Sequence, residues 1–123
     1  ALTTEGRRAL IVEDYQAAAE TFKELLEMLG HEADYVTQGA DVEPALASKR
    51  YDVVFMDINL PDIPGLTLVN YLRERLQQEY MPSFVAFTGF AAADVVGADT
   101  IFDAYLEKPL DLPSLERVLQ SLS

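Results

Sequence analysis

The chain has 123 residues, half of them hydrophobic, which suits one globular domain with a single packed core. Its 21 acidic residues outnumber nine basic ones, and the formal charge of −12 argues against nucleic acid and anionic membranes as partners. No apolar run approaches the length of a membrane span, and the lack of cysteine excludes disulfides and thiolate metal sites. We therefore expect a soluble, cytoplasmic domain.

Short apolar runs alternate along the chain with stretches in which apolar residues recur at helical spacing. The runs predict strands at Ala9–Val12, Ala33–Val36, Tyr51–Met56, Phe84–Phe87 and Ala104–Leu106. The stretches between them predict helices at Tyr15–Leu29, Ala40–Ser48, after Gly65 to about Glu79, Ala91–Val96, and after Leu112 to the chain end.

Glycine and proline mark several ends of these helices. Gly30 follows the first helix, as a C-cap residue does. Pro44 fits the second helix only in its first turn, and Pro113 suits the first turn of the last helix. Pro82 prevents the third helix from continuing.

Five alternations of strand and helix predict an α/β fold, in which a doubly wound parallel sheet carries helices on both faces. No linker or repeat is visible, so we expect residues 1–123 to form one domain, with a core at about 8–119 and no room for an output domain. The chain starts without Met and shows no secretory signal, which fits processing or excision from a longer protein.

Polar residues follow four of the predicted strands. The pair Glu13-Asp14 follows the first strand, Asp57 the third, Thr88 the fourth and Lys108 the fifth. Because right-handed crossovers bring the carboxyl ends of all strands to one edge, we expect these side chains to meet there. Each of them alone is an ordinary helix cap or turn residue, whereas the combination indicates a functional site.

Three clustered carboxylates favour a hard, oxygen-binding cation such as Mg²⁺. A carboxylate held beside Mg²⁺ and a lysine can attack phosphorus and form an aspartyl phosphate. The lysine and the metal then stabilise the phosphoryl oxygens in the transition state. The pattern therefore predicts phosphoryl transfer to an aspartate.

With these motifs the chain resembles the response-regulator receiver family of two-component signalling, from about Arg8 to Leu119. The matching segments are Ala9 to Asp14, Asp52 to Pro61 and on to Gly65, Thr88-Gly89, and Asp103 to Pro109. The resemblance implies a CheY-like, flavodoxin-like three-layer sandwich with five strands in the order 2-1-3-4-5. It also implies a signalling phosphoacceptor rather than an enzyme.

The resemblance assigns the acceptor and the metal ligands residue by residue. Asp57 would accept the phosphoryl group from a histidine kinase or a histidine phosphotransfer protein. Asp14 would bind Mg²⁺ directly and Glu13 mainly through water, with the backbone carbonyl of Asn59 as a further ligand. The lone histidine, His31, reads as a satisfied turn residue, so the donor is another molecule or domain.

The same resemblance assigns the phosphoryl contacts and a switch. Thr88 and Lys108 would bind the phosphoryl oxygens, and Tyr105 would change rotamer when Thr88 moves. The bond before Pro109 is expected to be cis. The chain departs from the family pattern at Phe90, which is bulky for a position bordering the phosphoryl site, and in a short segment between Thr88 and Lys108.

Other readings stay open at this point. Within the same chemistry, the chain could be the receiver segment of a hybrid sensor histidine kinase. A flavodoxin-like FMN carrier would need a phosphate cradle where Glu13-Asp14-Tyr15 stands, and a haloacid-dehalogenase phosphatase would need its acid motif after the first strand. A degenerate receiver would lack Asp57 or Lys108, and both are present.

Overall fold

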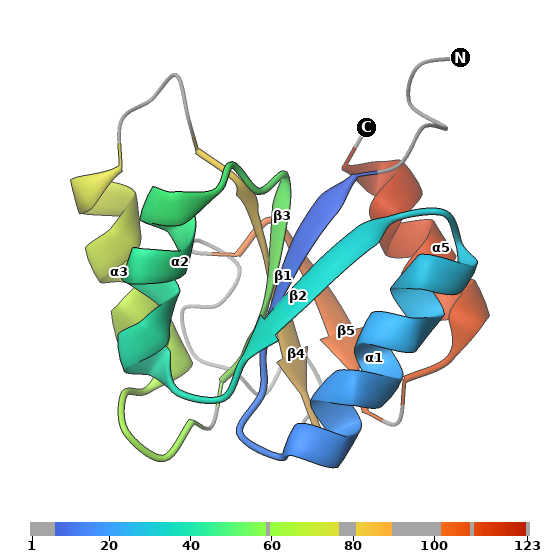
Figure 1. Ribbon diagram of the computed structural model, residues 1–123, viewed down its shortest axis with the longest axis horizontal. Coiled ribbons are helices and arrows are strands. Elements are labelled where there is room, and N and C mark those ends of the chain that lie inside the picture. The colour runs from blue at the N-terminus through green and yellow to red at the C-terminus, as the bar shows by residue number, and fades with distance from the viewer. Residues whose placement is uncertain (1–6, 59, 77–80, 90–101, 109, 123) are drawn as a thin grey trace.

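The computed structural model describes residues 7–58, 60–76, 81–89, 102–108 and 110–122. Its centre is one parallel sheet of five strands in the order β2-β1-β3-β4-β5, which confirms the predicted fold (Figure 1). The strands are β1 (Arg8–Val12), β2 (Glu32–Val36), β3 (Val53–Asp57), β4 (Ser83–Thr88) and β5 (Ala104–Glu107).

Helices cover both faces of this sheet. They are α1 (Gln16–Met28), η2 (Gly39–Asp41) running into α2 (Val42–Ser48), α3 (Gly65–Arg75) and α5 (Leu112–Ser121). Figure 1 shows α1 and α5 on one side of the sheet and α2 and α3 on the other. Pro44 lies in the first turn of α2 and Pro113 in that of α5, as predicted, and Asp111 caps α5 by accepting from the Ser114 N–H at 2.8 Å.

The alternation of side chains along the strands divides the core in two. On β3, Val54 and Met56 join the cluster under α2 and α3, while Val53 and Phe55 join the cluster under α1 and α5. All five residues of β3 are buried, as expected for a central parallel strand. Because Asp57 continues the Val53–Phe55 alternation, it belongs to the α1–α5 side.

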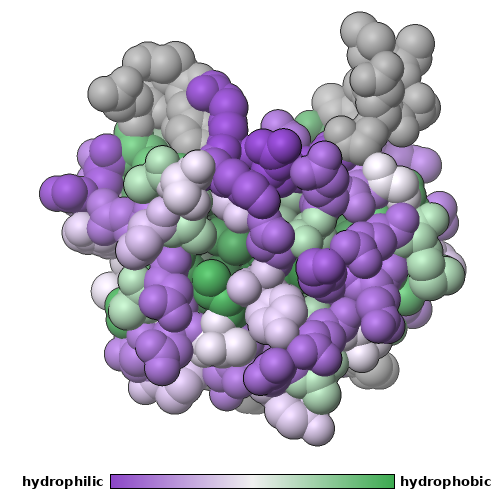
Figure 2. Space-filling view, viewed as in Figure 1, coloured by the Kyte–Doolittle hydropathy of each residue, from purple (hydrophilic) through white to green (hydrophobic). Residues whose placement is uncertain are grey.

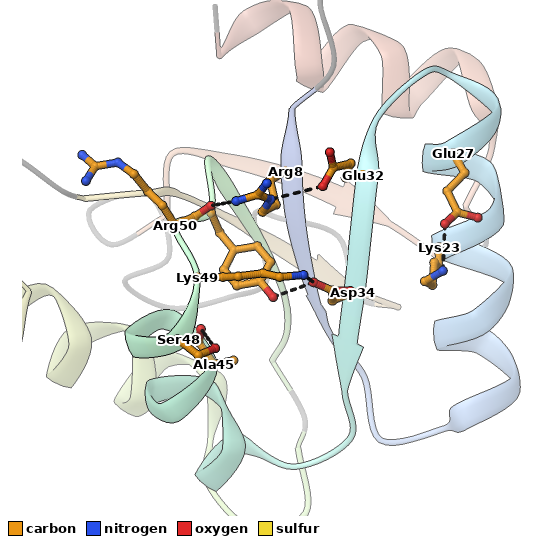
Figure 3. A network of polar contacts seen from close by, with 10 residues as sticks. Arg8, Lys23, Glu27, Glu32, Asp34, Ala45, Ser48, Lys49 and Arg50 are labelled. Carbon is orange, nitrogen blue, oxygen red and sulfur yellow. Dashed lines mark hydrogen bonds and ion pairs between the residues drawn. The ribbon is translucent and has the colours of Figure 1, made fainter.

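The edge strand β2 is more polar and is tied to the segment before β3. Asp34 accepts from the Tyr51 hydroxyl at 2.7 Å and pairs with Lys49 at 3.0 Å (Figure 3). Arg8 of β1 pairs with Glu32 at 3.3 Å. Hydrophilic residues also cover most of the face seen in Figure 2. In the described part of the chain, no helix is long and apolar enough to cross a membrane.

Two turns follow the prediction and one helix does not. Gly30 follows α1 with a φ of 91°, and His31 is a satisfied turn residue whose Nδ1 accepts from the Arg7 N–H at 3.0 Å. The third helix was predicted to reach about Glu79, but α3 ends at Arg75, and this prediction is wrong. The chain turns extended at Leu76, which packs its side chain against the core under α2 and α3. The helix predicted at Ala91–Val96 lies outside the described residues.

Candidate functional site

The carboxyl edge of the sheet brings together Glu13, Asp14, Asp57 and Lys108, as their positions after the strands predicted. Glu13 and Asp14 follow β1, Asp57 is the last residue of β3, and Lys108 follows β5. The Glu13 N–H donates to the Val36 carbonyl at the end of β2, at 3.1 Å. Glu13 is only 2% exposed and Asp57 4%, whereas Asp14 lies open to solvent. The site therefore combines two buried acids with a third acid that is exposed to solvent.

The three acids fit a single cation. One carboxylate oxygen from each of Glu13, Asp14 and Asp57 lies within 4.8 Å of the other two. Lys108 pairs with Glu13 and Asp57, so three carboxylates and one ammonium group leave two formal negative charges, the charge that Mg²⁺ would neutralise. The cluster is therefore the part of the site that could hold Mg²⁺. Asn59, the predicted carbonyl ligand, lies outside the described residues.

Lys108 bridges the two buried acids. Its Nζ donates to Glu13 Oε1 at 2.8 Å and to Asp57 Oδ2 at 3.2 Å. Partial burial lowers the pKa of Lys108, but the hydrogen bond to Glu13 and the charge of Asp57 outweigh it, and the net direction is upward. The lysine is therefore charged at neutral pH and stays close to the acceptor candidate.

Glu13 is a buried acid that lies close to two other carboxylates. Burial raises the pKa of its carboxyl, and the charge of Asp57 acts in the same direction. Hydrogen bonds from Lys108 and from the Tyr15 N–H at 3.2 Å act against this, yet the net direction is upward. The charged form of Glu13 is thus incompletely compensated by protein groups, and a bound cation would supply the rest.

The loop after Asp57 is folded tightly against the start of α3. The Gly65 N–H donates to the Ile58 carbonyl at 2.9 Å. Further along, the Asp62 carboxylate accepts from the Gly39 and Ala40 N–H groups, both at 3.0 Å. The two bonds to Asp62 tie the loop that follows Asp57 to the neighbouring segment after β2. Sequence reasoning missed Asp62, because its partners are distant along the chain.

The other predicted residues are placed only in part. Thr88 ends β4 and pairs in register with Glu107, but its side chain lies outside the structural description. Tyr105 is half-buried in β5 with its hydroxyl shielded from solvent, and its ring centroid is 6.3 Å from that of Phe102. The rotamer switch of Tyr105 stays a prediction. Phe90 and the bond before Pro109 lie outside the described residues.

Phe87 is a neighbour of the site that sequence reasoning did not single out. It pairs with Asp57 in the β3–β4 ladder, and Lys108 Nζ lies 4.9 Å from the centroid of its ring. The sequence signal that could have identified Phe87 as a neighbour of the site is its position directly before Thr88, at the end of an apolar run. Strand register was needed to see that it adjoins the acceptor candidate.

Comparison with known proteins decides the family. The family model described as "Response regulator receiver domain" matches residues 9–120. The chain belongs to this family. It is a receiver domain, a signalling module of two-component systems, and the FMN-carrier and phosphatase readings, which need other families, are not retained.

Curated relatives carry similar receiver domains in proteins of different length. The chain is 31% identical to the aerobic respiration control sensor protein ArcB of Escherichia coli over 90% of this chain and 14% of ArcB. It is 34% identical to the transcriptional regulatory protein TctD of Salmonella typhimurium over 94% of this chain and 51% of TctD. The polar-differentiation response regulator DivK of Brucella anthropi is 27% identical, with 94% of each chain covered. The receiver domain thus spans from about a seventh to nearly all of these relatives.

Solved structures confirm the fold and add a ligand-bound relative. A CheY-like receiver domain from Methylobacillus flagellatus is 56% identical, with a TM-score of 0.89, and covers 97% of this chain and 100% of its own. The response regulator TrrA of Thermotoga maritima, solved in complex with Mg²⁺ and BeF, is 25% identical with a TM-score of 0.83. That alignment covers 95% of this chain and 99% of TrrA.

Proposed function

We propose that this receiver domain accepts a phosphoryl group on Asp57 from a histidine kinase or a histidine phosphotransfer protein, with Mg²⁺ as cofactor. The observation that carries the proposal is the position of Asp57, which is buried, clusters with the acid pair and accepts a hydrogen bond from Lys108. Glu13, Asp14 and Asp57 would hold the metal, and the Mg²⁺–BeF complex of TrrA supports this assignment.

The reaction follows from these positions. A carboxylate oxygen of Asp57 attacks phosphorus, the phosphorus–nitrogen bond of the donor phosphohistidine breaks, and the imidazole leaves with the bonding electrons. Lys108, already within 3.2 Å of Asp57, transfers its hydrogen bonds to the phosphoryl oxygens. Glu13, Asp14 and Asp57 would hold Mg²⁺, which would supply Lewis-acid stabilisation of the negative charge in the transition state. Thr88 would bind a phosphoryl oxygen and pass the change to Tyr105.

The start of α1 is the surface we assign to the phosphoryl donor. Tyr15 is 67% exposed and Ala17 is exposed, directly beside the acid pair. They border a groove that reaches Glu13 and Lys108 and is otherwise largely apolar. Small residues let a donor helix come close, which in-line transfer to Asp57 requires.

Two architectures fit this function. The match to this chain covers nearly all of DivK, which fits a stand-alone regulator. It covers only a small part of ArcB, which fits a receiver segment within a sensor protein. In both cases the phosphorylated aspartate is the signal, and the domain itself turns over no substrate.

The proposal is tested by chemical phosphorylation. The chain is incubated with acetyl phosphate and Mg²⁺, and its intact mass is measured. One added phosphoryl group is expected, and Asp57→Asn is expected to abolish it. Retention of the added mass in Asp57→Asn, or its absence from the parent chain, would contradict the assignment.

A further inference from the structure

Phe87 lies on the path by which Lys108 reaches Asp57. Lys108 follows β5 and Asp57 ends β3, and β4 runs between these two strands. The residue of β4 in register with Asp57 is Phe87. Since neighbouring strands lie about 4.8 Å apart, the backbones of β5 and β3 are roughly 10 Å apart, and the side chains of Lys108 and Asp57 meet across β4. The lysine side chain crosses the sheet edge at Phe87.

The Phe87 ring forms the floor under that crossing. Lys108 Nζ lies 4.9 Å from the ring centroid, and Phe87 is only 5% exposed. The ring is held in turn by Phe22 of α1, 4.9 Å away at an interplanar angle of 67°, and Phe22 contacts Phe55 of β3 at 4.8 Å. Because all three rings belong to the packed core under α1 and α5, the floor is rigid.

The ammonium is thus held from two chemically different sides. Glu13 and Asp57 accept its hydrogen bonds at 2.8 and 3.2 Å, and the ring face attracts it through the aromatic quadrupole. The hydrogen bonds must be exchanged when a phosphoryl group arrives, whereas the ring contact need not change. The lysine side chain has four flexible carbons. A ring contact that persists while the hydrogen bonds are exchanged therefore keeps the Lys108 ammonium group in place.

We propose that Phe87 is a positioning residue that keeps Lys108 in place for the incoming phosphoryl group. The inference rests on the proposed function of Asp57 and Lys108. A leucine at position 87 would fill much of the same apolar volume but would present no aromatic face to the ammonium. The effect of Phe87 on phosphoryl binding should therefore depend on its being aromatic and on Lys108 being present.

A double-mutant cycle tests this dependence. Binding of beryllium trifluoride, a phosphoryl mimic, is measured by titration calorimetry in excess Mg²⁺ on the full chain. Phe87→Leu is expected to weaken binding about fivefold, and Phe87→Tyr to retain the parent affinity. In a Lys108→Ala background, Phe87→Leu is expected to cause no further loss.

Phe84 provides a matched control on the same strand. It is fully buried, faces the opposite core cluster, and lies under the Arg73 guanidinium, whose central carbon is 5.0 Å from the ring centroid. Phe84→Leu should lower the melting temperature at least as much as Phe87→Leu, yet leave the affinity for beryllium trifluoride unchanged. The control separates loss of core packing from loss of Lys108 positioning.

A second measurement reports the contact without any ligand. The ε-methylene protons of Lys108 should show upfield ring-current shifts in the parent NMR spectrum, and Phe87→Leu should remove them. The positioning role of Phe87 would be overturned, and the proposed function left intact, by either of two results. One is an unchanged affinity in Phe87→Leu, and the other is that Phe87→Leu weakens binding as much in the Lys108→Ala background as in the parent chain. Failure of the folded parent chain to bind beryllium trifluoride would overturn the proposed function, and this inference with it.

Discussion

Gly65 approaches Asp57 so closely that a Cβ atom on Gly65 would lie 2.8 Å from the Asp57 carbonyl oxygen. The same Cβ would lie 2.8 Å from Ile58 Cα, so both obstacles are backbone atoms that cannot rotate away. The start of α3 and the Asp57 end of β3 are therefore in direct contact, and the absence of a side chain at position 65 makes this contact possible.

Gly65→Ala should consequently destabilise the fold and displace Asp57. At an open helix position alanine would be about 1 kcal/mol better than glycine, but overpacking against backbone typically costs about 1–3 kcal/mol. We expect a lower free energy of unfolding in urea and slower labelling by acetyl phosphate. Gly89→Ala is the control, since no atom of the described residues lies within 4 Å of the Cβ position there, and its stability should change by less than about 0.5 kcal/mol. Equal stability of Gly65→Ala and the parent would contradict the contact.

Mg²⁺ should stabilise the folded chain, because it relieves the repulsion among Glu13, Asp14 and Asp57. At a free Mg²⁺ concentration of roughly 100 times Kd, the gain is expected to be about 2.7 kcal/mol. Asp14→Ala should remove most of this gain. Since Asp14 is exposed, the substitution should change the metal-free stability little. Thermal melts of both proteins with and without Mg²⁺ check this, and a parent melting temperature indifferent to Mg²⁺ would rule out the metal site.

Ala17→Glu should slow phosphoryl transfer from a donor protein while leaving labelling by acetyl phosphate intact. Ala17 is exposed beside the acid pair, whereas Ala19, two residues on, is fully buried and unsuited to this test. Met28→Glu is the control, because Met28 is 71% exposed on the same helix but lies about 16 Å further along its axis. Transfer kinetics from the donor and from acetyl phosphate distinguish the outcomes, and equal loss with both donors would indicate misfolding instead of lost docking.

His31 should titrate below its ordinary range. Burial lowers the pKa of its imidazole from the usual 6.5, and the charge of Arg7 lowers it further. Because the unfolded chain takes up the proton first, stability should fall as the pH drops below about 6.5 and should stop falling below the folded pKa. Proton NMR of the single imidazole measures the midpoint directly in the folded and the urea-unfolded chain. A folded midpoint at or above the unfolded one would contradict the hydrogen bond from the Arg7 N–H.

The sequence alone was enough to predict the five strands and the edge at which they converge. Strand and helix periodicity is a local property, so the apolar runs before Asp14, Asp57 and Lys108 indicated where three strands end. Parallel topology then required their carboxyl ends to meet. The acid pair, the acceptor candidate and the lysine therefore followed from pattern, and the family resemblance added their roles and the strand order.

Tertiary structure alone decided the contacts between distant segments. The end of α3 depends on where Leu76 can reach the core. The hydrogen bonds that Asp62 accepts depend on the position of η2. The contact between the Phe87 ring and Lys108 depends on the register of β4 against β3. Each of these contacts joins residues with no fixed spacing along the chain, so no periodic pattern encodes them. Whether Phe87 was one more core aromatic or a neighbour of the acceptor candidate became visible only when Asp57 and Phe87 were found side by side in the sheet.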